Sequence, residues 1–346
     1  MKVRKFLKWT GLSLLLILIL LGVWQRELVA YGWLQLKGQL RVVNNAIPLE
    51  EFLELPGTTE EQKEKIQIIL EAKTFAFEKL GINESDNYST IYDQEGKPSM
   101  YVVTACDPYF FRARMWSFPI VGSVPYKGFF DLEKAREEAK QIQEQEELEV
   151  DIRTAGGWST LGWFKDPVLS NMLNRSEGDL ASLIIHELTH GTLFVKDSVT
   201  FNENLASFIG DKGAILFLED KYGIGSEEVI SFKNGLKDEI KFKDFMLGSA
   251  QYLDSVYRAM VDLPLSEKER LKSEAMKQIV NNYDTVDFAS TLYKGYFEKR
   301  QPKNTYFMSM LRYNGQQQEL ERQLQEDFEG DLLAYLNYLK KRFPSL

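Results

Sequence analysis

The sequence predicts a predominantly helical α+β protein, with a small sheet in its first half and a helical second half. Runs rich in β-branched and aromatic residues, interrupted by Pro and Gly, fall between residues 100 and 164 and are typical of strands. Apolar residues then recur at helical spacing through most of residues 179–343. A hydrophobic content of 44% in 346 residues, with 22 Phe and 16 Tyr, is enough for a well-packed core.

The N-terminus has the pattern of a targeting segment. Four basic residues and no acidic residue lie in the first eight positions, and a largely apolar run follows over about residues 9–24. This order is typical of a secretory signal or a signal anchor, and a helix needs about 20 apolar residues to cross a bilayer. No small-x-small cleavage pattern follows the run. We therefore expect residues 1–30 to form an uncleaved membrane anchor, with a cleaved signal as the alternative.

Residues 31–346 are expected to form one domain, with a sheet-containing part over about 58–170 and a helical part over about 171–346. A helix is expected over residues 59–80, ended by Gly81. Strands are expected at residues 100–105, 109–121, 148–154 and 158–164, with a charged helix over 131–147. The later helices are expected at residues 179–195, 202–222, 226–262, 266–282 and 302–343.

Charge and composition exclude some classes of function. A net charge of −9 argues against a nucleic acid as the main partner, because such partners call for basic surfaces. The single cysteine, Cys106, excludes an internal disulfide framework and a cysteine-based zinc cluster. Histidine is almost as rare: the chain has only two, His186 and His190, and they are four residues apart.

Both histidines belong to an H-E-x-x-H motif, His186-Glu187-Leu188-Thr189-His190. Residues four apart lie on one face of a helix, so both imidazoles can bind one metal ion. Glu187 follows the first ligand and can contact a water on the metal without coordinating it. The surrounding helix is apolar nearly all round, which predicts burial. Buried polar side chains need partners, and either a divalent metal or hydrogen bonds within the core would supply them.

Glu203 is the candidate third ligand. It lies thirteen positions after His190, and a turn at residues 196–198 would fold its helix back on the first. Two histidines, one glutamate and an open position are usual for catalytic zinc, whereas structural zinc has four protein ligands. The alternative is that Glu203 interacts only with the dipole of its helix. Asn202 is expected either to cap this helix or to orient a ligand.

The motif followed by Asn-Glu and a helix of small residues resembles the gluzincin metallopeptidases. Further segments are similar to the bacterial family described as putative zinc aminopeptidases, and this resemblance covers most of the chain. The similar segments are residues 38–40 (GQL), 118–130 (FPIVGSVPYKGFF), 159–169 (STLGWFKDPVL), 186–193 (HELTHGTL) and 201–203 (FNE). The resemblance implies Zn²⁺ bound by His186, His190 and Glu203, with Glu187 as the catalytic residue. It also implies a membrane-associated enzyme whose catalytic domain is exported to the bacterial periplasm or cell surface.

The functional hypothesis is therefore a zinc-dependent peptidase, expected to be an aminopeptidase, that acts on peptides or proteins. Glu187 would move protons between a metal-activated water and the leaving amine. The family's pattern favours Tyr313 as the donor to the oxyanion. Residues 158–164, with Trp163 and Phe164, are expected to form the strand that binds substrate.

The spacer of twelve residues before Glu203 and the lack of a G-x-M-E-N segment differ from well-studied gluzincin aminopeptidases. A membrane-anchored endopeptidase or processing peptidase, a hydrolase of non-peptide amides and an inert zinc-binding scaffold are the alternatives.

Overall fold

The structure, a computed structural model, describes residues 9, 25–118, 122–154, 165–195, 198–299, 301–313 and 317–343. The chain has two units, Met1–Asn45 and Ala46–Leu346. In the first unit, helix α2 spans Arg26–Asn45. Apart from Trp9 the apolar run expected to be an anchor lies outside the described residues. Among the helices that are described, none combines the length and the apolar character needed to span a bilayer.

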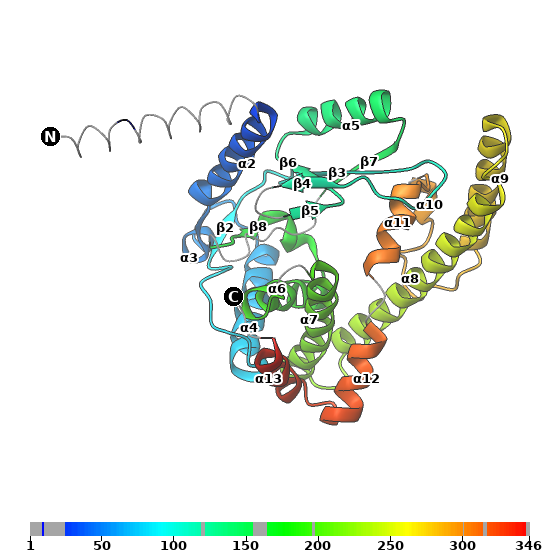
Figure 1. The fold of residues 1–346 in the computed structure, drawn as a ribbon. Coiled ribbons are helices and arrows are strands. Elements are labelled where there is room, and N and C mark those ends of the chain that lie inside the picture. Colours follow the sequence, from blue (N-terminus) through cyan, green and yellow to red (C-terminus); the bar gives the residue numbers. More distant parts are fainter. Residues whose placement is uncertain are drawn as a thin grey trace. The chain divides into compact units, whose positions relative to one another are not determined.

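The described part of the second unit contains three small β-sheets (Figure 1). In one of them β2 (Thr90–Tyr92) lies between β1 (Ile47–Pro48), which is antiparallel to it, and β8 (Val168–Leu169), which is parallel. In another, β3 (Tyr101–Cys106) pairs antiparallel with both β6 (Lys127–Phe129) and β7 (Glu149–Thr154). The last pairs β4 (Trp116–Phe118) with β5 (Gly122–Val124). Of the strand expected over 109–121, the described residues 109–118 form only the short piece β4.

Helices make up most of the rest of this unit. In the first half these are α3 (Leu49–Leu53), α4 (Glu60–Leu80) and α5 (Leu132–Glu146). A 3₁₀ helix, η1 (Ser170–Asn174), leads into the second half. There follow α6 (Glu177–Thr192), α7 (Val199–Tyr222), α8 (Glu227–Ala259), α9 (Leu265–Tyr283), α10 (Tyr296–Lys299), α11 (Asn304–Tyr313), α12 (Gln317–Phe328) and α13 (Leu332–Arg342). The predicted class, α+β and predominantly helical, is confirmed.

Helix α4 shows how local sequence signals set an element that supports the site. The Thr59 hydroxyl accepts a hydrogen bond from the Gln62 N–H, and the Gln62 side chain accepts one from the Thr59 N–H, which is a capping box. At the other end Gly81 adopts φ of 71°, the left-handed conformation that commonly ends helices. Between these ends Ile66 and Ile69 are fully buried, and α4 packs against α6 and α7.

The described residues of the helical stretch expected over 302–343 form α11, α12 and α13. Glu329 and Gly330 have positive φ values of 54° and 82°, which α12 cannot continue through. Asp331 then caps α13, because its Oδ1 accepts a hydrogen bond from the Ala334 N–H at 2.9 Å. The chain therefore turns between α12 and α13, and both helices pack against α7.

Candidate metal centre

Helix α6 carries the H-E-x-x-H motif. Its N-terminus is capped by Ser176, whose hydroxyl accepts a hydrogen bond from the Asp179 N–H at 3.2 Å. The apolar side chains of α6 are buried, with Leu180, Ile184 and Ile185 0% exposed. The motif's two histidines and Glu187 are half-buried. The helix is thus fixed by its apolar faces and presents the polar motif at a partly open surface.

Helix α7 lies close to α6 because glycines on it face that helix (Figure 1). A Cβ added to Gly210 would lie 2.7 Å from the backbone oxygen of Ser182 and 3.1 Å from the Cβ of His186. A Cβ added to Gly213 would lie 2.7 Å from the Leu80 side chain of α4 and 3.1 Å from the Ile185 side chain of α6. A larger residue at Gly210 would therefore push the two backbones apart. Since Glu203 is on α7, this packing sets its distance from the histidines.

The connection between α6 and α7 is held by Asn202. Its Oδ1 accepts a hydrogen bond from the Val195 N–H at 2.8 Å, and its Nδ2 donates one to the Val195 carbonyl at 2.8 Å. The N-cap of α7 is Ser198, so the interpretation of Asn202 as a helix cap is wrong. Asn202 therefore ties the start of α7 to the segment that leaves α6.

His186, His190 and Glu203 converge at one point. The two Nε2 atoms are 3.2 Å apart, and the Glu203 carboxylate oxygens lie 3.7 Å from the Nε2 of His186 and 3.6 Å from that of His190. Zinc bonds of about 2.0–2.2 Å in a tetrahedron place ligand atoms roughly 3.3–3.6 Å apart. The observed distances span this range, so the three donors fit around one ion. Within the described residues no other group of three or more His, Cys, Asp or Glu side chains converges in this way.

The two histidine rings differ in their remaining contacts. The Nδ1 of His186 lies 3.4 Å from the hydroxyl of Ser207, which is one turn after Glu203 on α7. The Nδ1 of His190 is buried and has no hydrogen-bond partner in the described part of the chain. Histidines that bind a metal through one nitrogen commonly hydrogen-bond through the other. Ser207 therefore orients the first histidine, whereas no described residue makes such a contact with the second.

The charged groups of the cluster shift one another's pKa values. Burial alone would lower the pKa of His186, but its interaction with Glu203 and the charge of Glu187 raise it. Burial and the charge of His186 lower the pKa of His190 to about 4. Burial alone would raise the pKa of Glu203, but the histidines lower it. At neutral pH, Glu203 is therefore ionised and His190 neutral, and these are the protonation states that bind metals.

Glu187 lies beside these ligands on α6. Burial raises the pKa of its carboxyl group to about 7, and the negative charges of Glu203 and Asp166 add to the rise. A carboxyl group with a pKa near neutrality can accept a proton and later release it. Its environment therefore suits acid–base chemistry next to the three donor atoms.

Comparison with known proteins supplies the family. Residues 30–342 match the family described as putative aminopeptidase. The chain belongs to this family. No significant match was found among curated proteins or among solved structures. The resemblance to this aminopeptidase family that the sequence segments indicate is therefore confirmed.

Three expected site residues of this family member cannot be placed. Trp163 and Phe164 lie outside the described residues. Tyr313 is the last residue of α11, but its side chain also lies outside the described part. The substrate-binding role expected of the first two and the oxyanion role expected of Tyr313 stay predictions.

Sequence reasoning missed the residues of α7 that support the cluster. Ser207 and Gly210 follow Glu203 at intervals of four and seven residues, so all three lie on the same face of the helix. The signal was present, since small side chains recur along this face. It indicates close helix packing, but it does not by itself identify the helix against which α7 packs.

Proposed function

We propose that this member of the aminopeptidase family is a zinc-dependent peptidase that removes N-terminal residues from peptides. The observation that carries the proposal is the spacing of the three donor atoms of His186, His190 and Glu203, between 3.2 and 3.7 Å. This spacing suits tetrahedral zinc, and three protein ligands leave one position for water or substrate. An open position is the property that distinguishes catalytic zinc from structural zinc.

Each residue has a definite part in this proposal. The Nε2 atoms of His186 and His190 and the carboxylate of Glu203 would hold the ion. When bound, zinc would polarise the scissile carbonyl and lower the pKa of a coordinated water towards neutrality. Glu187 would take a proton from the attacking water and deliver it to the leaving amine. Family membership supports the peptide bond as the substrate, and the donor spacing supports the metal.

Metal analysis of the purified protein is the first test. We expect one zinc ion per chain, retained through dialysis and removed by a strong chelator together with peptidase activity. Glu203→Ala should lower the zinc content while the protein stays folded. A folded wild-type protein that binds no zinc at neutral pH would refute the metal assignment.

Glu187→Gln tests the catalytic role independently of the metal. The amide keeps the shape of the side chain but cannot accept the proton, so we expect full zinc occupancy and a loss of about 10²–10⁴-fold in kcat. Glu177→Gln is the matched control on the same helix, because its carboxylate accepts a hydrogen bond from the Tyr222 hydroxyl away from the cluster. The control should retain the wild-type rate, and a fully active Glu187→Gln variant would eliminate the proposed base.

Peptides with free and acetylated N-termini test the position of cleavage. Digestion of a peptide library, followed by mass spectrometry, should show stepwise loss of N-terminal residues from the free peptides only. Internal cleavage of both sets would identify an endopeptidase instead.

A further inference from the structure

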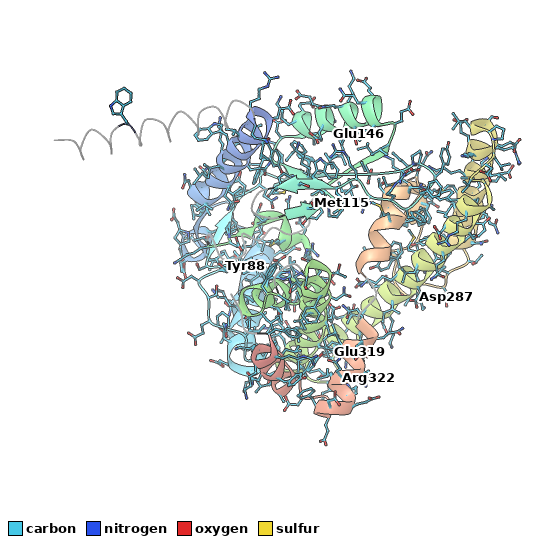
Figure 2. The ribbon with its side chains drawn as sticks, viewed as in Figure 1. Tyr88, Met115, Glu146, Asp287, Glu319 and Arg322 are labelled. Atoms are coloured by element: carbon cyan, nitrogen blue, oxygen red, sulfur yellow. The ribbon has the colours of Figure 1, made fainter. Side chains whose placement is uncertain are left out.

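The helix of the first unit, α2, carries a stripe of exposed apolar side chains. Figure 2 shows side chains projecting from several sides of α2, which Figure 1 labels. The apolar stripe consists of residues at intervals of four, three and four, which lie on one face of a helix: Val29, Trp33, Leu36 and Leu40. All four are exposed, and Trp33 is the most exposed at 67%. Large apolar side chains exposed together mark an interaction surface.

The apolar stripe is separate from the face that α2 buries. The buried residues of α2 are Gly38 and Val42. At about 100° per residue, both lie roughly 150–170° around the helix axis from the middle of the stripe. The stripe itself is about 16 Å long, at roughly 1.5 Å per residue. Helix α2 therefore has a second apolar surface, on the side away from its buried residues.

Basic residues lie along one side of this stripe. Arg26, Lys37 and Arg41 are exposed and form the basic flank, which follows the stripe around the helix. Glu27, the only acidic residue of α2, lies roughly opposite the stripe. Tryptophan favours the level of the lipid headgroups, and basic side chains are attracted to anionic lipids. An apolar face with a basic flank is thus complementary to the surface of an anionic bilayer.

The position of α2 in the chain favours the same partner. The largely apolar run over about residues 9–24 ends two positions before Arg26, where α2 begins. If that run lies in a bilayer, as the sequence predicts, α2 starts at the bilayer surface, and the tether keeps its apolar stripe at a high local concentration there. Pairing with the α2 of a second copy would cover the stripe but would leave the basic flank without complementary charge. A bilayer uses both features.

We propose that α2 lies along the surface of a bilayer that contains anionic lipids. The apolar stripe would enter the boundary between headgroups and acyl chains, and the basic flank would contact the headgroups. Membrane attachment would then extend beyond the anchor expected over residues 1–30. The inference goes beyond the proposed function, because it involves neither the metal centre nor peptide hydrolysis.

A fluorescent label in the apolar stripe tests this orientation in the full chain. Leu36→Cys supplies a thiol for an environment-sensitive fluorophore, and Cys106 stays unlabelled in the folded protein because it is 0% exposed. The protein is placed in vesicles of phosphatidylcholine and phosphatidylglycerol, a fraction of whose lipids carry a quencher on the acyl chain near the headgroup. We expect strong quenching of the label by these lipids and little quenching by iodide in the water.

Glu27→Cys is the matched control, because residue 27 is exposed on the same helix but lies away from the stripe. Its label should respond in the opposite way, with several-fold weaker quenching by lipid and strong quenching by iodide. Both proteins contain the same apolar run, so attachment through that run alone gives no such difference. Both should keep the wild-type Tm, since the substitutions are on the surface.

Replacing the three residues of the basic flank by glutamine in the Leu36→Cys protein tests the charge. Each basic residue near an anionic surface contributes a factor of about five to binding, so lipid quenching at residue 36 should weaken. The same weakening is expected for the unaltered flank in vesicles without phosphatidylglycerol.

Two results would overturn the inference while leaving the proposed function intact. One is lipid quenching at residue 36 that is no stronger than at residue 27, because α2 would then not present its stripe to the bilayer. The other is a label at residue 36 that is protected from iodide but not quenched by lipid, because protein would then cover the stripe. Conversely, a protein without zinc or peptidase activity would remove the proposed function and leave this inference standing.

Discussion

Gly210→Ala tests whether the close approach of α7 to α6 positions the metal centre. The new Cβ would lie 2.7 Å from the Ser182 backbone oxygen and 3.1 Å from the Cβ of His186, whereas real Cβ atoms almost never come within 3.0 Å of another heavy atom. The obstructing atom is backbone, so no side-chain rotation relieves the contact. The helices must separate by some tenths of an ångström.

The expected change in the free energy of unfolding is the balance of two opposing effects. Overpacking costs about 1–3 kcal/mol, and alanine is favoured over glycine in a helix by about 1 kcal/mol, so the free energy of unfolding should fall by roughly 1 kcal/mol. Glu203 lies two turns before Gly210 on α7 and would move with it. Metal sites tolerate deviations of about 0.2 Å in ligand distance, so we expect zinc affinity to fall by about tenfold or more.

Guanidinium unfolding and competition with a chromophoric zinc chelator measure these two quantities. Gly235→Ala in α8 is the control, because nothing lies within 4 Å of its added Cβ. It should gain about 0.5–1 kcal/mol of stability and bind zinc like the wild type. If the control behaves in this way while Gly210→Ala binds zinc with wild-type affinity, the packing of α7 on α6 does not position Glu203.

Two further substitutions test the contacts around the cluster. Ser207→Ala should weaken zinc binding by about 10–100-fold in equilibrium dialysis, because it removes the contact to the Nδ1 of His186; unchanged affinity would mean that packing alone orients the ring. Asn202→Ala should lower the free energy of unfolding by about 1–3 kcal/mol in urea, because it leaves both polar backbone groups of Val195 without their partner. Its zinc content should be unchanged, and loss of zinc from the folded variant would indicate that Asn202 acts on a ligand.

The helices that could be predicted well are those whose ends are set by nearby residues. The cap at Thr59 and the left-handed Gly81 fix α4 almost as expected. Helix α6 extends over Glu177–Thr192 rather than the expected 179–195, because Ser176 caps it earlier. The break between α12 and α13 was missed because it depends on a left-handed glutamate, Glu329, and residues of this type seldom adopt that conformation.

The residues of the candidate site also differ in how far local sequence identifies them. His186 and His190 could be identified because their spacing alone places them on one helical face, and Glu187 because it follows the first of them in the motif. Glu203 required the further inference that the next helix folds back on the first.

The geometry of the cluster comes from the scaffold rather than from attraction among its donors. The two imidazole nitrogens are 3.2 Å apart, and Glu203 lies beyond hydrogen-bond distance of both while its side chain is 36% exposed. Interactions of this length with a partly exposed carboxylate contribute little to stability. The distances must therefore be imposed by the buried faces of α6 and by the glycine contact of α7. It follows that metal affinity should depend on residues such as Gly210 that never touch the ion, whereas an equally destabilising change in the core where Phe245 of α8 packs against Tyr283 of α9 should leave it unaltered.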